Sequence, residues 1–263
     1  MEILVCVRRV PDTSENEIAL NSAGNDIERD DLVYSINEWD NYAVEEALQI
    51  VDRMGGSVTV VTVGNEEDEE VLRREMAMGA HHGVLLTDEV YDGSDARGIS
   101  TILKAFVKKG KYDLILTGVQ SEDGGAQVGG MLAAMLDYPF ASLVNSIEIL
   151  DEKTLKVSRE IEGGNKEISR IELPCVLSIQ TGINEPRYVG MRGIRQVASI
   201  PILTPTAEEL GINSESVGQT AARVKRVDYF IPQAGKGAEM LQGSREENID
   251  KLLELVAAKG GLK

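Results

Sequence analysis

Short apolar runs alternate with helix-type patterns along the first half of the chain. Four runs rich in Val, Ile and Leu predict buried strands: Glu2–Val7, Ser57–Val63, Gly83–Thr87 and Tyr112–Thr117. After each run, apolar positions recur at helical spacing and predict helices over residues 37–54, 66–78, 94–109 and 128–136. Strand and helix therefore alternate four times, which predicts an α/β fold with a doubly wound, mostly parallel, Rossmann-like sheet.

The pattern changes after Pro139, where strand-type segments follow one another with little helix between them. These segments are Phe140–Ile149, Thr154–Ile161, Lys166–Leu173 and Cys175–Gln180. The Gly163-Gly164-Asn165 sequence is a hairpin turn signal. We expect these strands to add an antiparallel extension to the sheet.

Beyond Ile200 the chain is rich in proline and glycine, and little there is expected to pack into a core. Its last element is a helix over Ser244–Lys259, in which Ser244 and Glu247 form a capping box and Leu252, Leu253, Leu255 and Val256 give an apolar face. The predicted division is residues 1–200 as a nucleotide-binding α/β domain and residues 201–263 as an arm that contacts a partner. The alternative is a tail that folds back on its own domain.

Composition and charge narrow the class of protein. The net charge of −17 repels phosphate backbones, so we expect no nucleic-acid partner, although backbone N–H groups can still bind a nucleotide phosphate locally. Cys6 and Cys175 lie in strand-type runs and are expected to be buried, and no zinc-type spacing is present. No apolar run is long enough for membrane insertion, and the first strand leaves no room for a signal peptide. We therefore expect a cytoplasmic protein, or a mitochondrial matrix protein in a eukaryote.

A glycine-rich stretch after the fourth strand is the first candidate for chemistry. Residues 118–130 carry five glycines, four of them before Gly130. They lie in a strand–loop–helix setting that allows backbone N–H groups to approach phosphate oxygens. The stretch is neither a Walker loop nor a GxGxxG motif, and a glycine-rich turn without a ligand remains the alternative. The helix start at residues 37–40 is expected at the same end of the sheet, where Asn37 either caps the helix or binds a base or ribose; for Trp39 simple core packing is at least as good an interpretation.

The stretch Gln180–Arg195 breaks all periodicity, with three arginines, one proline and Met191 between Gly190 and Gly193. Two glycines that keep the backbone mobile around a flexible apolar side chain suit a docking loop, which we place at residues 183–195. An ordinary surface loop is the alternative. No catalytic constellation of serine, histidine and carboxylate is present, so the chain is expected to be a binding or electron-transfer subunit and not a stand-alone enzyme.

The chain resembles the beta subunit of electron transfer flavoproteins along essentially its whole length. The matching motifs are Val7-Arg-Arg-Val-Pro-Asp12, Asn37-Glu-Trp-Asp-Asn-Tyr-Ala-Val-Glu-Glu-Ala-Leu48, Leu72-Arg-Arg-Glu-Met-Ala-Met-Gly-Ala80, Gly118-Val-Gln-Ser-Glu-Asp123 with Ala126-Gln-Val-Gly129, Arg159-Glu-Ile-Glu-Gly-Gly164, Leu173-Pro-Cys-Val176 and Asn184-Glu-Pro-Arg-Tyr188. The last of these is highly specific. The resemblance implies a heterodimer with an alpha subunit that holds the redox FAD. It also implies electron transfer from flavin dehydrogenases to a downstream quinone-linked oxidoreductase.

The resemblance further implies an adenine nucleotide in the beta subunit: AMP in ordinary members, or a second FAD in electron-bifurcating ones. The Asn-Glu-Trp-Asp form and the Arg192-Gly-Ile-Arg195 segment are more similar to the AMP-binding members. A stand-alone nucleotide-binding module of the same sheet architecture stays a third possibility. The implied nucleotide-binding residues are Cys6, Asn37, Glu38, Trp39, Asp40, Val63, Gly118, Val119, Gln120, Ser121, Asp123, Gly124, Gly125, Ala126, Gln127 and Val128. The implied docking residues are Asn184, Pro186, Arg187, Tyr188 and Met191, with Met191 at the anchor position that dehydrogenases recognise.

Overall fold

The computed structural model describes residues 1–121, 124–233, 235, 237–238 and 240–261. The chain forms two compact units. The first comprises Met1–Ile18 and Arg29–Val227, and the second comprises Ala19–Glu28 and Asp228–Lys263. The separation of a nucleotide-binding domain from an arm at residue 200 stays a prediction.

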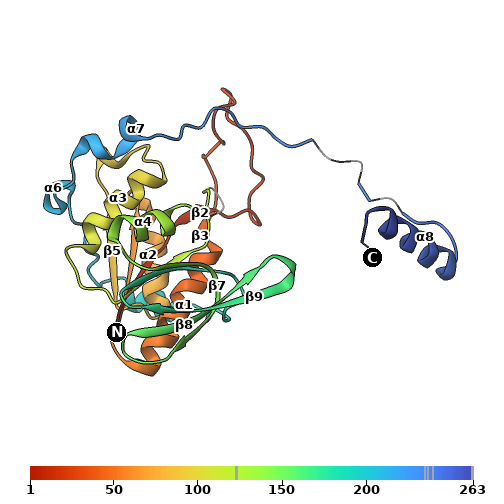
Figure 1. Cartoon of the computed structure of the whole chain (residues 1–263). Helices are drawn as coiled ribbons and strands as arrows, with labels where there is room; N and C mark the ends of the chain where they lie inside the picture. The colour runs from red at the N-terminus through yellow and green to blue at the C-terminus, as the bar shows by residue number, and fades with distance from the viewer. Residues whose placement is uncertain (122–123, 234, 236, 239, 262–263) are drawn as a thin grey trace. The chain divides into compact units, whose positions relative to one another are not determined.

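An eight-stranded sheet forms the centre of the first unit (Figure 1). Its order is β5-β4-β1-β6-β10-β7-β8-β9. The strands are β1 (Glu2–Cys6), β4 (Ser57–Val63), β5 (His82–Leu86), β6 (Leu114–Gly118), β7 (Phe140–Ile149), β8 (Thr154–Ile161), β9 (Asn165–Glu172) and β10 (Cys175–Ile179). Two short strands, β2 (Arg9–Pro11) and β3 (Tyr34–Ile36), form a separate antiparallel pair. The first six strands in the sheet order are parallel, and β8 and β9 are antiparallel, which confirms the predicted fold class.

One strand of the predicted extension lies elsewhere. Cys175–Ile179 was expected among the antiparallel strands, but β10 lies between β6 and β7 and runs parallel to both. Every residue of this strand is buried, as expected for a central parallel strand that is covered on both faces. The hairpin turn at Gly163 and Gly164 is confirmed, because both residues have positive φ angles and connect β8 to β9.

Helices cover both faces of the sheet. The helices are α1 (Glu38–Met54), α2 (Glu69–Met78), α3 (Ala96–Val107), α4 (Val128–Leu136), α5 (Met191–Val197), α6 (Ala207–Leu210), α7 (Gly218–Ala221) and α8 (Arg245–Ala258). One apolar core joins the sheet to α1, α2 and α5, and a second joins it to α3, α4 and α6. Alternate residues of a strand enter opposite cores: Ile3 and Val5 the first, and Leu4 the second. Neither β1 nor β6 therefore has a solvent-exposed face.

Residues 201–227 pack more closely than their breaker-rich sequence predicts. Val217 is fully buried, and Ala207 and Leu210 are also buried in the second core. Leu203 forms a parallel bridge with Val84 beside β5. The expectation that little beyond residue 200 joins a core is wrong for this part of the chain.

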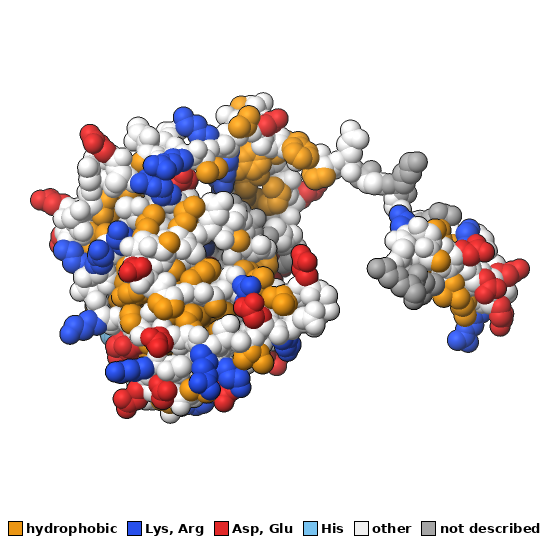
Figure 2. Space-filling view, in the orientation of Figure 1, with side chains coloured by type: hydrophobic (Ala, Val, Ile, Leu, Met, Phe, Trp, Pro, Cys, Tyr) orange, Lys and Arg blue, Asp and Glu red, His pale blue; other side chains and the backbone are white. Residues whose placement is uncertain are grey.

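The second unit contains α8, which begins after Ser244 and has the predicted capping box with Glu247. Its leucines Leu252, Leu253 and Leu255 are between 43% and 54% exposed. In the first unit, exposed apolar side chains occur on β7, β8 and β9, such as Phe140, Ile161 and Ile168. Figure 2 shows apolar side chains, in orange, gathered on one face of this unit. No helix in the described residues is long and apolar enough to cross a membrane.

Candidate functional site

The carboxyl ends of β1 and β6 meet the first turn of α1. β1 pairs with β6 so that Cys6 lies beside Thr117, and α1 begins after the return of the chain through β3. The Asp40 carboxylate lies at this junction. Its Oδ2 accepts a hydrogen bond from the Arg8 backbone N–H at 2.9 Å, and its Oδ1 accepts one from the Gly118 N–H at 2.9 Å. One acidic side chain thus ties together the segments that follow two neighbouring strands.

Burial dominates the electrostatics at this junction. It raises the pKa of Asp40 to about 7, although hydrogen bonds from the Gly118 N–H, the Asn37 side chain and the Arg8 N–H favour the charged form. Burial, followed by the nearby Asp40 charge, also raises the pKa of the Cys6 thiol, so Cys6 is a neutral apolar contact and not a nucleophile. Val63 lies at the carboxyl end of β4 and, like Cys6, is partly buried against the second core.

Asn37 occupies the N-cap position of α1 without capping it. Its side-chain amide donates to the Gln120 carbonyl at 2.9 Å, and its side chain accepts no hydrogen bond from a backbone N–H of the first helical turn. Asn37 is fully buried, and its Oδ1 has no hydrogen-bond partner among the described residues. A buried amide oxygen without a donor carries a free-energy penalty, and a ligand N–H or O–H at this point relieves it.

The glycine-rich loop, residues 118–128, leads from β6 into α4. A side chain at Gly118 would lie 2.4 Å from Asp40 Oδ1, so only glycine fits where α1 and β6 approach. At the start of α4, Gly129 allows the buried hydroxyls of Thr117 and Ser178, 2.9 Å apart, to lie against the helix backbone. Gly124, Gly125, Ala126 and Gln127 are exposed, Val119, Ser121 and Val128 are partly buried, and Asp123 lies outside the described residues.

For two of the residues predicted for the adenosine side, Glu38 and Trp39, the role stays a prediction. Glu38 is exposed on the first turn of α1. Trp39 donates from its indole Nε1 to Gln180 Oε1 at 3.1 Å, which connects α1 to the end of β10. The sequence did not predict that the hydroxyls of Thr117 and Ser178 lie at the start of α4. These residues belong to β6 and β10, and the sequence did not show that these two strands are neighbours.

The segment of residues 184–191 follows β10 and lies along α1. Asn184 and Arg187, both predicted to contact a partner, are occupied within the chain: Asn184 Nδ2 donates to the Tyr42 carbonyl, and Arg187 pairs with Glu45 and Asp52. Tyr188 is 92% exposed and Met191 is 66% exposed, while Pro186 is partly buried. The structure thus leaves two of the five predicted docking side chains largely free.

Met191 does not lie at the tip of a loop. It is the first residue of α5, and Gly190 precedes that helix in an extended conformation. Gly193 lies within α5, where an added Cβ would come to 3.0 Å from the Ala77 carbonyl oxygen of α2. Gly193 therefore permits close helix packing, which corrects the expectation that this glycine keeps the backbone mobile.

Two surface hollows lie away from this junction. One, of about 270 Å³, is lined by residues of β7, β8 and β9 that include Arg159 and Glu167. The other, of about 310 Å³, is lined by residues 89–92 and 214–220. Neither is lined by a residue predicted to bind a nucleotide, so support for that site comes from the contacts around Asn37 and Gly118.

Known proteins resemble this chain over most of its length. The electron transfer flavoprotein domain family matches residues 25–210. The electron transfer flavoprotein subunit beta of Methylophilus methylotrophus is 35% identical, and the match covers 97% of this chain and 98% of the relative. The corresponding protein of Bacillus subtilis is 33% identical over 98% of each chain. The caffeyl-CoA reductase-Etf complex subunit CarD of Acetobacterium woodii is 37% identical over 93% of each. Because both the family and its full-length members match, the chain belongs to the electron transfer flavoprotein family, as a beta subunit.

Proposed function

We propose that this chain is the beta subunit of a heterodimer whose alpha subunit holds a redox FAD, and that the pair carries electrons from flavin dehydrogenases to a downstream quinone-linked oxidoreductase. In this proposal the crevice at the ends of β1 and β6 binds AMP, and the protein acts in the cytoplasm. The beta-subunit relatives support the assignment. The structural observation that supports it most directly is the buried Asn37 amide, whose nitrogen donates to the Gln120 carbonyl of the glycine-rich loop and whose oxygen has no donor among the described residues.

The residues present fit an adenine nucleotide in kind. Asn37 offers an amide oxygen for a base or ribose, and the start of α4 offers backbone N–H groups for a phosphate. The partial positive charge at a helix N-terminus allows an anion to bind even though the chain carries a charge of −17. Asp40 holds the start of the glycine-rich loop by accepting a hydrogen bond from the Gly118 N–H. AMP has no redox chemistry, so its role in this proposal is structural.

A second FAD in place of AMP is the other candidate ligand. One of the relatives is a subunit of a reductase-Etf complex, which associates this type of chain with a larger assembly. The experiment is to denature the purified heterodimer and count the flavin and AMP released. One flavin and one AMP per heterodimer support the AMP proposal. Two flavins and no AMP contradict it and favour the second FAD. A chain that purifies alone with nucleotide and binds no alpha subunit contradicts both.

The proposed docking site is the exposed pair Tyr188 and Met191. Electron carriers bind their partners briefly, and a small apolar anchor suits that better than a large interface. Met191→Ala is expected to weaken partner affinity by about 1–3 kcal/mol, as truncation of a small hot spot does. The measurement is the rate of flavin reduction as a function of dehydrogenase concentration. Met54→Ala, at another exposed methionine, is the control. An unchanged concentration dependence for Met191→Ala contradicts the docking assignment.

The proposed contact with the alpha subunit is the apolar face of α8. Its residues Leu252, Leu253 and Leu255 are about half exposed, so a partner that buries them fully adds, for each, about half of the roughly 1.5–3 kcal/mol that a fully exposed side chain would gain. Deleting the chain after Gly243 is expected to weaken association with the alpha subunit and leave the sheet unit folded. Replacing Leu252 and Leu253 together with serine is a second test in the intact chain. If both variants co-purify one-to-one at nanomolar concentration, α8 is not the contact.

A further inference from the structure

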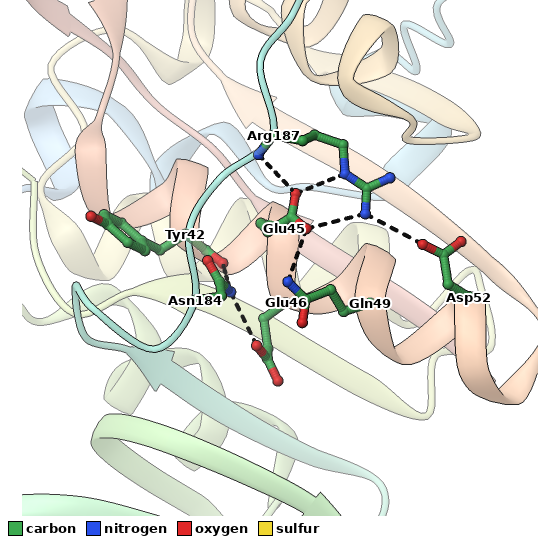
Figure 3. A network of polar contacts seen from close by, with 7 residues as sticks. All are labelled: Tyr42, Glu45, Glu46, Gln49, Asp52, Asn184 and Arg187. Carbon is green, nitrogen blue, oxygen red and sulfur yellow. Dashed lines mark hydrogen bonds and ion pairs between the residues drawn. The ribbon is translucent and has the colours of Figure 1, made fainter.

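The 184–191 segment is attached to the middle of α1 by a compact polar network. Figure 3 shows Arg187 reaching across to Glu45, with Gln49 and Asp52 on the following turns of the helix. Glu45 Oε2 accepts hydrogen bonds from the Arg187 backbone N–H at 3.1 Å and from its Nε at 2.8 Å. Glu45 Oε1 accepts from Arg187 Nη2 at 3.1 Å. Three bonds from one residue fix both the side chain and the backbone of the segment at residue 187.

Glu45 is the buried member of this pair. Its side chain is 5% exposed, whereas that of Arg187 is 39% exposed. Burial alone raises the pKa of Glu45, but hydrogen bonds from Arg187 and Gln49 outweigh it and hold the pKa below its usual value. The hydrogen bonds that Arg187 donates to Glu45 are the leading cause of the raised pKa of Arg187. The charged form of the pair is therefore the stable form, and an Arg–carboxylate fork of this kind has a strongly preferred geometry.

Asp52 makes the weaker contact with the same guanidinium. It lies 3.3 Å from Arg187 Nη2, and its side chain is 65% exposed. Exposed ion pairs contribute little because water screens them. The chain thus provides its own comparison between a buried acid and an exposed acid that hold the same arginine.

The two side chains left free in the segment lie directly after this attachment. Tyr188 is the next residue, and Met191 begins α5 three residues later. Upstream, Asn184 Nδ2 donates to the Tyr42 carbonyl at 3.1 Å and to Glu46 Oε2 at 3.0 Å. The backbone is held at residues 184 and 187, so the positions of Tyr188 and Met191 relative to α1 depend on those attachments.

We propose that Glu45 is a positioning residue for partner docking: by holding Arg187 through three hydrogen bonds, it sets where Tyr188 and Met191 stand for the partner. This inference rests on the proposed docking function of the segment. In this proposal α1 positions two segments, because Asp40 in its first turn also holds the glycine-rich loop. Glu45 itself touches neither partner nor flavin in this proposal.

The test uses Glu45→Gln, which keeps the size of the side chain and removes the charge. Amide hydrogen exchange of residues 184–191 in the heterodimer is expected to accelerate by about tenfold, because a neutral amide cannot accept all three bonds from Arg187. The dehydrogenase concentration that gives half-maximal flavin reduction is expected to rise by about fivefold, with the rate at saturation unchanged. Flavin and nucleotide content are expected to stay at the wild-type level.

Two further variants control the experiment. Asp52→Asn removes only the exposed contact and is expected to change either readout by less than about twofold. Arg187→Lys keeps the positive charge but loses the forked hydrogen bonds to Glu45. Because Arg187 is the more exposed member of the pair, this variant tests the positioning role if Glu45→Gln does not fold. It is expected to shift both readouts in the same direction as Glu45→Gln.

The outcomes separate this inference from the docking proposal beneath it. Unchanged exchange in Glu45→Gln and Arg187→Lys overturns the positioning role. Faster exchange with a wild-type concentration dependence also overturns it if Met191→Ala weakens docking. Faster exchange with no effect of either Glu45→Gln or Met191→Ala on reduction shows that the attachment exists and that docking occurs elsewhere. Faster exchange together with a higher half-maximal concentration supports the inference.

Discussion

The two segments that leave the neighbouring strands β6 and β10 are both attached to α1, but by different kinds of contact. In the first turn of α1, the side chains of Asp40 and Asn37 bond to backbone atoms of Gly118 and Gln120. In the middle of the helix, Glu45 and Glu46 bond chiefly to side chains of Arg187 and Asn184. The glycine-rich loop is thus held by its main chain, and the 184–191 segment by the identity of its residues.

This difference decides which substitutions each segment tolerates. A contact to a backbone N–H survives any side-chain change that does not collide, so the glycine-rich loop is constrained mainly where a Cβ does not fit. A contact to a side chain is lost when that side chain is shortened. Position-specific glycine effects are therefore expected in the first region, and graded effects of side-chain chemistry in the second.

The largest effect is expected from Gly118→Ala, which adds one carbon at the point where the loop meets α1. The new Cβ would lie 2.4 Å from Asp40 Oδ1 and 2.7 Å from the Cβ of Trp39, so the helix and the strand must separate. We expect a loss of about 3 kcal/mol in the free energy of unfolding, at the upper end for overpacking. Urea unfolding of the purified protein measures it.

Gly125→Ala is the matched control within the same loop. Its Cβ would meet only the end of Gln127, at 3.4 Å, and we expect a change of less than about 0.5 kcal/mol. Equal losses in the two alanine variants would mean that the whole loop, and not its approach to Asp40, is sensitive to side chains. The contrast between the two regions would then be lost.

Glu75 of α2 adds a third acid to the comparison, since its charge interacts with both Asp40 and Glu45. It is fully buried, and neither carboxylate oxygen has a hydrogen-bond partner among the described residues. Burial raises its pKa from 4.5 to about 8. Unlike Glu45, it accepts no hydrogen bond from an arginine among the described residues, and burial outweighs the nearby Arg74 charge, so we expect it to be protonated at neutral pH.

The pH dependence of stability follows from that shift. Between pH 4.5 and about 8 the folded state keeps a proton that the unfolded state has lost, so the free energy of unfolding falls as pH rises through this window. Glu75→Met removes this slope. We expect the variant to exceed the wild type by on the order of 3 kcal/mol at pH 8.5, with the difference shrinking toward pH 5. Urea titrations at several pH values measure it, and Glu66→Gln, at an exposed acid of the preceding turn, is the control. A difference that does not vary with pH would show that Glu75 is not protonated in the fold.

A smaller loss is expected from Asp40→Asn. The amide keeps one acceptor but directs an NH₂ group at one of the two backbone donors, Arg8 or Gly118. We expect a loss of about 2 kcal/mol at pH 8, the cost of one buried donor without a partner. Burial raises the pKa of Asp40 to about 7, so as pH falls below 7 the folded wild type keeps a proton that the unfolded chain has lost, and its advantage over the uncharged variant should grow. A loss that does not grow as pH falls below 7 would contradict the raised pKa of Asp40.

The pattern of the sequence was enough to predict α1, α2, α3, α4, α8 and most strands, because each of these elements repeats its apolar residues with its own period, but it did not predict the short helices α5, α6 and α7. It was not enough to place β10, since strand pairing is a property of residues far apart in the chain. The run Cys175–Ile179, in which only Ser178 is polar, carried a usable signal, because edge strands of an antiparallel extension alternate. β8 does alternate in this way in its first half, with Leu155 and Val157 buried between partly buried neighbours.

The candidate site was predicted unevenly for the same reason. The residues of the glycine-rich loop could be identified because strand, glycines and helix follow one another in sequence. The attachment of Arg187 to Glu45 spans 142 positions, and nothing in either local pattern indicates it. The sequence therefore indicated only a role of Arg187 and Asn184 toward a partner, which stays a prediction, and not the bonds to α1 that the structure shows.

The smallest effect is expected from Asn184→Ala, at the upstream attachment of the 184–191 segment. The change removes two hydrogen bonds, to the Tyr42 carbonyl and to Glu46 Oε2, and leaves the buried Glu46 carboxyl without that donor. Burial already raises the pKa of Glu46, so this acid can take up a proton and lower the penalty. We expect a loss of about 1 kcal/mol, which corresponds to a fall of about 2–4 °C in Tm for a protein of this size. Asn165→Ala, in the exposed β8–β9 turn, is the control for loss of an asparagine side chain. Thermal unfolding measures both variants. A fall larger than that of Gly118→Ala would reverse the comparison, because the segment held by its side chains would then stabilise the fold more than the loop that is held by its backbone.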